Sequence, residues 1–368
     1  PDSGGLTVRV SPSLASGVRT GLVYLDEHPW ESAETTVSRF LPRLALRRAA
    51  ETLGLTDLDL PEGNTDALVR RSLQRIYRNQ NQDGGWGWWA EDDSDPAITA
   101  YTLIGLGTAK VAGFPVDPQV EEKAAAYLGA QLDMARDVQR PEFDLRAYLL
   151  YALALDGRGD LGRSFALAEQ RANLSNTAKA WTAIAIKNSG GATDDPRLTA
   201  LMSDLQSAAI ASATGNHWEE AAYDPGTFGN SVQTTAQVLQ AFTALQPDHP
   251  LVDGTLRWLM VARKEGHWES PHDTAMAIMA ITDFMIVRRD VQAAFDYAIA
   301  FNGEIRLQGH TERGKVHQED TVVIPMTDLI KDAINRLDIS RSPASALGRL
   351  YYTAHLKYFT PAQEIEAA

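Results

Sequence analysis

The spacing of hydrophobic and polar positions divides the chain into three stretches. Residues 5–12 (GLTVRVSP) alternate apolar and polar and end at a proline, which predicts a short, half-buried strand. From about residue 15 to residue 298, segments of helical period follow one another, with Gly, Pro or Asp breaks between them. After residue 298 short alternating stretches return, separated by turn residues. The pattern therefore predicts a mainly helical chain that begins and ends in strands.

The predicted elements suggest how the domains are arranged. The clearest helical segments, many of them rich in Ala and Leu, are 41–54, 65–80, 98–113, 117–132, 143–157, 177–190, 231–245 and 273–285. The candidate strands are 297–314, 320–329, 335–343 and 348–359, and FNGE at 301–304 fits a hairpin turn. We therefore expect a small antiparallel β-domain at 299–362 that is completed by strand 5–12. The helical domain, 13–298, would be inserted between these strands.

Three of the helical segments repeat one plan. Residues 84–106, 215–245 and 266–285 each open with a glycine and a tryptophan, continue with acidic or small residues, and enter a Thr/Ala-rich helix. The segments 142–156 and 175–189 keep the helix and lose the leading tryptophan. Small residues along a helix let neighbouring helices approach closely. Period and composition together favour a helical repeat.

Composition removes several classes of function. The chain has 368 residues and a formal net charge of −14, which argues against nucleic-acid binding, because phosphate recognition needs a basic surface. It has no cysteine, and therefore no disulfide, thiolate metal site or cysteine nucleophile. No apolar run reaches the length of about 18 residues that a membrane span requires. We recognise no signal peptide at the start, so we expect a piece of a longer protein.

Residues 81–89 (NQDGGWGWW) resemble the Gln/Trp repeat motif of terpene-cyclase and prenyltransferase toroids. An enzyme of that type is therefore one alternative. The first argument against it is that a cyclase needs an Asp-x-Asp-Asp acid, and Leu60 follows Asp57-Leu58-Asp59 here. The second is that a prenyltransferase zinc site needs a thiolate, which a chain without cysteine cannot supply. We expect the tryptophan to be structural and to cap the N-terminal mouth of an outer helix.

Two further groups of side chains could carry chemistry. Residues 91–95 (EDDSD) could bind a divalent cation, but they precede Pro96 at a helix start, where acidic residues favour the helix dipole. Residues 217–220 (HWEE) and 267–269 (HWE), with His272 and Asp273, offer possible ligands or general bases. They recur at equivalent places in the repeats, so shared turn geometry explains them as well. No Gly-x-Ser-x-Gly elbow and no P-loop occur.

Residues 17–46 (GVRTGLVYLDEHPWESAETTVSRFLPRLAL) resemble the thioester region of bacterial α2-macroglobulins. In that family a Cys-x-Glu-Gln sequence leads into a helix that begins Thr-Val-Ser-Arg-Phe-Leu-Pro, and residues 37–42 match that helix. Glu34 stands at the family's Glu, whereas Ser32 stands at the Cys and Thr35 at the Gln.

The resemblance extends over nearly the whole chain. Residues 3–14 resemble the strand that leads into the family's thioester domain, and residues 267–281 resemble its last toroid repeat, with His272 where a Gln is usual. Residues 348–359 resemble a strand of the family's CUB-like β-domain, into which the toroid is inserted. The resemblance therefore implies an α/α toroid, a closed ring of helical hairpins, within a CUB-like domain.

The resemblance also implies a function, and the departures from the motif change it. A thioester forms when a Cys thiol displaces ammonia from a Gln amide, and it captures amines or hydroxyls of an attacking protease. Ser32 is a poor substitute for a thiolate, and Thr35 carries no acyl group. We therefore expect that the thioester has been lost, that Ser32 or Thr35 caps the helix, and that Glu34 accepts backbone N–H groups.

By this resemblance the chain belongs to a non-catalytic protease trap that acts non-covalently, needs no cofactor or metal, and lies in the periplasm or cell envelope. Its expected partners are proteases and other domains of the parent chain. A non-catalytic interaction module that binds an envelope protein is the second alternative, beside the toroid enzyme.

Overall fold

The computed structural model describes residues 4–11, 14–55, 65–134, 140–220, 229–289, 294–312, 319–331, 333–343 and 348–359. The chain forms two compact units. The helical unit holds Gly17–Ala49 and Leu60–Arg288, and the β-unit holds Pro1–Ser16, Ala50–Asp59 and Arg289–Ala368. Asp57 and Asp59 lie outside the described residues.

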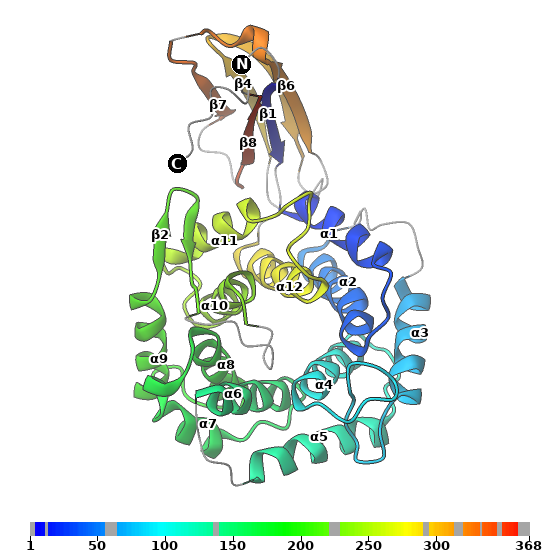
Figure 1. Ribbon diagram of the computed structural model, residues 1–368. Coiled ribbons are helices and arrows are strands. Elements are labelled where there is room, and N and C mark those ends of the chain that lie inside the picture. Colours follow the sequence, from blue (N-terminus) through cyan, green and yellow to red (C-terminus); the bar gives the residue numbers. More distant parts are fainter. Residues whose placement is uncertain are drawn as a thin grey trace. The chain divides into compact units, whose positions relative to one another are not determined.

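The helical unit is a ring of helices in two layers, an α/α toroid as predicted (Figure 1). The inner helices are α2 (Ala33–Leu53), α4 (Pro96–Val111), α6 (Arg140–Leu155), α8 (Asn176–Asn188), α10 (Ser231–Leu245) and α12 (Pro271–Arg288). The outer helices are α1 (Ala15–Glu27), α3 (Thr65–Arg78), α5 (Pro118–Asp133), α7 (Leu161–Ala168), α9 (Pro196–Ser207) and α11 (Leu251–Val261). A short hairpin of β2 (Ile210–Ser212) and β3 (Gly215–His217) follows α9.

Burial explains why the two layers differ in sequence. The inner helices α4 and α10 are buried around nearly their whole circumference, so apolar and small residues occupy all their faces. The outer helix α9 buries a single stripe that includes Leu198, Leu201 and Leu205, which is the pattern of an amphipathic helix. Gly105 of α4 lets α2 approach, because a Cβ there would lie 2.9 Å from Val37.

The three tryptophans that open the repeats join one outer helix to the next inner helix. Each indole Nε1 donates to a carbonyl in the last turn of the outer helix, at 2.8 Å for Trp86, 2.7 Å for Trp218 and 3.0 Å for Trp268. All three side chains are fully buried. They therefore cap the C-terminal end of an outer helix and not its N-terminal mouth, because the orphan groups they meet are carbonyls.

The β-unit packs two three-stranded antiparallel sheets against each other. One has the order β6 (Asp320–Pro325), β1 (Gly4–Ser11), β8 (Tyr351–Tyr358), and the other β5 (Glu304–Thr311), β4 (Phe295–Phe301), β7 (Leu337–Ser342). Alternate residues face inward because side chains of a strand alternate between its faces. Their buried core is Val8, Val10, Phe295, Tyr297 and Ile299.

Two details locate the predicted strands. Asn302 and Gly303 both have positive φ (50° and 84°) and form the predicted hairpin turn between β4 and β5. Strand β4 begins at Phe295, ahead of the boundary expected at residue 299. Among the described helices, none combines the length and the apolar character that crossing a bilayer requires.

Candidate functional site at the start of helix α2

The segment that departs from the thioester motif forms the first turn of α2. Ser32 immediately precedes the helix, and its Oγ accepts a 3.1 Å hydrogen bond from the backbone N–H of Thr35. This is the N-cap arrangement, in which a side-chain oxygen satisfies one of the four orphan N–H groups of a helix start. Ser32 is only 5% exposed. The expectation that a hydroxyl caps this helix is met by Ser32.

The Thr35 side chain folds back over the same turn. Its Oγ1 lies 3.2 Å from Oγ of Ser32 and donates to the carbonyl oxygens of Trp30 (3.1 Å) and Ser32 (3.2 Å). Thr36 Oγ1 donates to the Ser32 carbonyl as well, at 2.7 Å. The hydroxyls at positions 32 and 35 are therefore in contact, and the turn itself occupies both of them.

Four of the other inner helices begin in the same way. Asp95 accepts backbone N–H groups at the start of α4, Ser175 at α8, Asn230 at α10 and Ser270 at α12. Ser32 thus takes the place that the repeat gives to a capping residue. A serine at this position satisfies the local chemistry of the ring without any covalent link.

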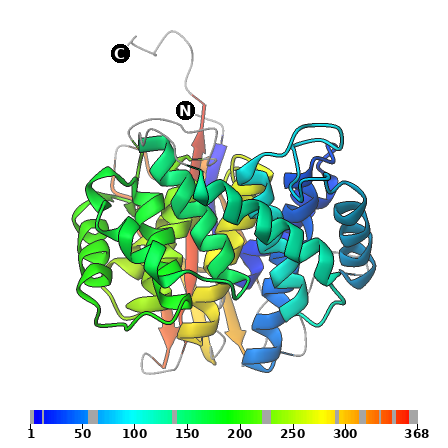
Figure 2. The same ribbon diagram turned by 90° about the horizontal axis from the view of Figure 1, so that it is seen from below.

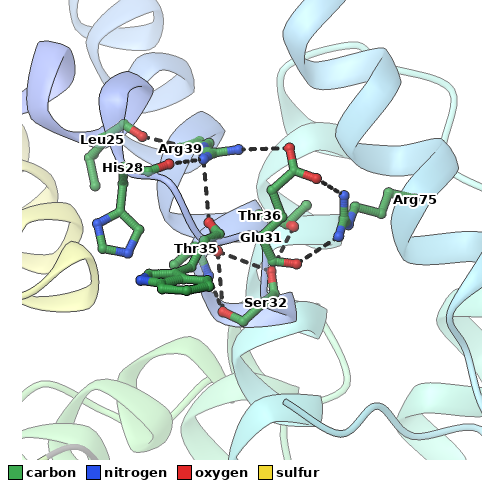
Figure 3. A network of polar contacts seen from close by, with 9 residues as sticks. Leu25, His28, Glu31, Ser32, Thr35, Thr36, Arg39 and Arg75 are labelled. Carbon is green, nitrogen blue, oxygen red and sulfur yellow. Dashed lines mark hydrogen bonds and ion pairs between the residues drawn. The ribbon is translucent and has the colours of Figure 1, made fainter. Parts of the chain in front are cut away.

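Arg39, in the second turn of α2, binds the loop that precedes this helix (Figure 3). The guanidinium donates to the carbonyls of Leu25 (3.1 Å), His28 and Trp30 (3.4 Å). Because peptide carbonyls cannot move independently of the chain, these bonds fix the path of the loop.

Glu31 adds a second tether at the same place (Figure 3). Its carboxylate pairs with Arg39 at 3.3 Å and with Arg75 of α3, and Arg75 also donates to the Glu31 carbonyl at 2.7 Å. Arg75 is the main reason why the pKa of Glu31 lies below its usual value. The loop is therefore clamped between α2 and α3.

Glu34 points into the protein and not toward the helix backbone, which corrects the expectation that it accepts N–H groups. It is 6% exposed, and its Oε1 accepts a 2.6 Å hydrogen bond from Ser38 Oγ. Ser38 Oγ also lies 2.9 Å from the phenolic oxygen of Tyr101 on α4. Burial raises the pKa of Glu34 to about 7, assisted by the nearby Asp273 and opposed by Ser38.

Residues from the far end of the sequence complete this buried cluster. The rings of His272 and Tyr101 pack in a T-shaped arrangement, with centroids 4.8 Å apart. Burial lowers the pKa of His272 to about 3, so the imidazole is neutral. Asp273 accepts from Ser270 Oγ and from Asn230 Nδ2, both at 2.8 Å. The sequence predicted His272 and Asp273 as candidates but gave no indication that they would face Glu34.

The remaining candidates have structural partners. Asp95 of the 91–95 cluster is the cap of α4 and accepts from Ala97 and Ile98. His217 bonds Glu219 at 3.2 Å, and His267 stacks on Tyr24 with ring centroids 3.8 Å apart. Among the described residues, no group of three or more His, Cys, Asp or Glu side chains is arranged to hold a metal ion.

The geometry limits what this site can do chemically. The first turn of α2 supplies hydroxyls that are already engaged in capping and the buried carboxyl group of Glu34. Helix α12 adds the neutral His272. The sequence contains no thiol. Ser38, Arg39 and Tyr101 shape the site, but the sequence did not mark them as site residues. Helical spacing from Glu34 and from the loop could have pointed to Ser38 and Arg39. Tyr101 reaches the site only through tertiary contact.

The fold is an α/α ring of paired helices, and the same chain forms a small β-sandwich. The first inner helix of the ring begins at a capped turn. These features define the class of TED-domain proteins. The family model for the A-macroglobulin TED domain matches residues 96–284, more than half of the chain. The chain belongs to this family. The tryptophan repeat therefore belongs to the ring of a TED domain and not to a terpene cyclase or prenyltransferase.

Curated relatives agree with this assignment. The chain is 30% identical to the alpha-2-macroglobulin of Thermotoga maritima over 121 residues, which are 33% of this chain and 7% of that protein. It is 23% identical to an alpha-2-macroglobulin homolog of Nostoc over 298 residues, 77% of this chain and 15% of that protein. The chain thus spans a small part of the relatives that it matches.

Solved structures show the same fold. The crystal structure of Salmonella alpha-2-macroglobulin reacted with methylamine superposes with a TM-score of 0.65 at 18% identity, over 96% of this chain and 22% of that one. Native Escherichia coli alpha-2-macroglobulin from domain MG7 to the C-terminus gives 0.63 at 16% identity, over 98% and 54%. The agreement includes the helical ring and the small β-unit.

Proposed function

We propose that this chain is the thioester-less TED region of a bacterial α2-macroglobulin-like protein that inhibits proteases without forming a covalent bond to them. Ser32 and Thr35 occupy the places of the reactive Cys and Gln, and Glu34 the place of the Glu between them. The observation that carries the proposal is the cap: Ser32 Oγ accepts the N–H of Thr35. The position that holds the reactive Cys in the family thus holds a serine that caps a helix in this chain.

The chemistry supports this assignment. Thioester formation needs a sulfur nucleophile and a carboxamide, and neither Ser32 nor Thr35 provides one. A serine hydroxyl is a weaker nucleophile and a worse leaving group than a thiolate. In the described part of the chain no base is hydrogen-bonded to Ser32 Oγ, and the Glu34 carboxyl group is engaged by Ser38. Inhibition would therefore be steric and would depend on conformational change in the parent protein.

The setting follows from the same family. Bacterial α2-macroglobulins are envelope-associated, and we place this chain in the periplasm or on the cell envelope, within a parent chain whose other domains contact it. We assign the helical unit, expected at 13–298, to the toroid, and the β-unit, expected at 299–362 with strand 5–12 but beginning with β4 at Phe295, to a CUB-like β-domain. Proteases are the proposed targets.

Treatment with methylamine tests the loss of the thioester. The chain is incubated with an excess of methylamine and then analysed by intact mass and thiol titration, beside a family member that carries the Cys-x-Glu-Gln motif. We expect that the control gains methylamine and releases one thiol, whereas this chain changes in neither respect. Incorporation of methylamine at residues 32–35 would overturn the proposal.

A protease assay tests the mode of inhibition. The parent protein is incubated with a protease, and the mixture is separated by gel filtration and, after boiling in detergent, by denaturing electrophoresis. We expect protease to coelute with the protein in the first separation and to be free in the second. A protease band that stays attached after boiling would contradict non-covalent trapping, and the absence of coelution would contradict trapping altogether.

A further inference from the structure

The exposed tryptophans of the protein lie on two adjoining loops. Trp30, in the loop before α2, is 65% exposed, and Trp88 and Trp89, in the segment between α3 and α4, are 38% and 51% exposed. The remaining tryptophans are at least partly buried; they are Trp86, Trp181, Trp218, Trp258 and Trp268. Indole side chains normally bury most of their large apolar surface, so three exposed ones in one place need an explanation.

The repeat architecture does not explain them. Trp86 is the structural tryptophan of its repeat, equivalent to Trp218 and Trp268. Two positions after it stands Trp88, whereas the equivalent positions of the other repeats hold Glu220 and Ser270. The pair Trp88–Trp89 is therefore an addition to the plan of the ring and not a part of it.

The two loops form one continuous surface. The backbone N–H of Ala33, the first residue of α2, donates a 2.9 Å hydrogen bond to the Trp88 carbonyl. The second loop is braced internally, since Asp92 Oδ2 accepts from the Trp89 N–H at 3.0 Å and the Asp92 N–H returns a bond to the Trp89 carbonyl. Figure 2 shows the segment between α3 and α4 projecting at one end of the ring. The indoles are therefore displayed on an ordered support.

The charge around this tryptophan patch (Trp30, Trp88 and Trp89) is negative. Glu91, Asp92 and Asp93 follow directly and are all exposed, and the described residues hold no ion pair to any of them. Arg39 and Arg75, at the base of the neighbouring loop, share the single carboxylate of Glu31, so the three exposed carboxylates still outweigh the positive charge that remains there. Aromatic faces beside uncompensated carboxylates are complementary to cationic groups.

We propose that the tryptophan patch binds an arginine- or lysine-bearing segment of a separate protein, with the cationic side chains over the indole faces and their charge met by Glu91 and Asp93. Arginine suits this surface best, because the planar guanidinium stacks on aromatic rings and is weakly hydrated. The inference is independent of the protease-trap function, since it concerns a surface that neither the repeat nor the helix cap requires.

A labelled short peptide in which Arg and Ser alternate tests the proposal by fluorescence anisotropy, beside a Glu–Ser peptide of the same length. We expect the chain to bind the Arg–Ser peptide alone, with an affinity that falls as salt is added. Trp30→Ser and Trp89→Ser should each weaken binding about tenfold. The double variant Glu91→Gln/Asp93→Asn should weaken it too and flatten its salt dependence.

Control variants remove exposed apolar area or negative charge elsewhere on the surface. Val111→Ser alters a side chain that is 78% exposed, and Glu51→Gln/Asp194→Asn removes two exposed charges far along the chain from the patch. These variants should bind as the wild type does. Equal binding by the Trp30→Ser and Trp89→Ser variants would overturn the proposal. So would preference for a neutral oligosaccharide, or a wild-type dimer that the tryptophan variants dissociate, because the occupant would then be a sugar chain or a second copy.

Discussion

The Ser38 hydroxyl donates a 2.6 Å hydrogen bond to Oε1 of Glu34, one turn earlier on the same helix α2. The same hydroxyl oxygen lies 2.9 Å from the phenolic oxygen of Tyr101. The first turn of α2 thus combines the Ser32 cap with the buried carboxyl group of Glu34. Both features can be tested through stability, because neither depends on finding a partner.

Glu34 should make stability depend on pH. Burial raises its pKa from 4.5 to about 7, so the folded state keeps a proton that the unfolded state releases. The resulting stabilisation is complete below pH 4.5 and is lost as pH rises through about 7, a change of about 3 kcal/mol in the free energy of unfolding. Glu34→Gln stays neutral, so its stability relative to wild type should rise over that range.

Urea unfolding at pH values on either side of this window measures the effect. Glu51→Gln is the matched control, since it replaces an exposed carboxylate on the same helix α2. Parallel profiles for wild type and Glu34→Gln would show that the carboxyl group does not titrate in this window.

Ser32→Ala should destabilise the protein by removing the acceptor for the Thr35 N–H. Loss of a serine N-cap costs about 1 kcal/mol. Ser175→Ala, which removes the equivalent cap of α8, should cost a similar amount in the same unfolding assay. If Ser32→Ala were neutral while Ser175→Ala was not, the helix cap could not be the role of Ser32.

Local patterns in the sequence were enough to predict the helices of the repeat, whereas the closed ring was expected from the resemblance to the family. The segment 231–245 was predicted from its helical period, and α10 has these bounds because Asn230 caps its start. The turn at Asn302–Gly303 was equally readable, since both residues must adopt positive φ. Such features depend on a few consecutive residues and therefore leave a recognisable pattern.

The site was less predictable, because long-range packing decides its chemistry. The sequence placed Glu34 near a helix start, where a carboxylate commonly bonds the backbone. In the structure Ser38 draws it inward toward Tyr101, and His272 comes from the last repeat to pack against that ring. Which residues of distant repeats meet inside a ring depends on its closure, and no local pattern records that.

Asp156 should give a second pH effect at the other end of the inner helices. Its side chain is 1% exposed and lies beside the carboxylate of Glu121, which is 3% exposed and bonds Lys110 through both oxygens at 2.8 Å. Burial and this neighbour raise the pKa of Asp156 from 3.8 to about 7. The stabilisation from its proton is present below pH 3.8 and is lost as pH rises through about 7.

Asp156→Asn should therefore be more stable than wild type at alkaline pH, with little difference in acid, in thermal unfolding followed by circular dichroism. Asn keeps the shape and resembles the protonated carboxyl group, so the bonds from Lys110 to Glu121 persist. Asp133→Asn provides the control, because that carboxylate is 67% exposed in its pair with Arg163. A destabilisation of Asp156→Asn at every pH would mean that its ion pair with Arg158 outweighs the repulsion from Glu121.

The threonines that bind the repeat tryptophans should contribute to stability through hydrogen bonds to the tryptophan backbone, where each Oγ1 accepts the N–H and also donates to the carbonyl at 3.4 Å. Thr99, Thr235 and Thr274 accept the backbone N–H of Trp86, Trp218 and Trp268 at 3.0, 3.1 and 3.2 Å. Replacing Thr99 or Thr235 with valine keeps the shape and leaves a buried N–H unsatisfied. We expect a loss of about 1–3 kcal/mol in the free energy of unfolding for each variant.

Thr243 provides the control on the same inner helix as Thr235. Its Oγ1 is buried without a hydrogen-bond partner in the described part of the chain, so Thr243→Val removes a polar group that gains nothing from the fold. This variant should be as stable as wild type or more so. Equal losses for Thr235→Val and Thr243→Val in urea unfolding would mean that the cost arises from the β-branched apolar side chain and not from the tryptophan hydrogen bond.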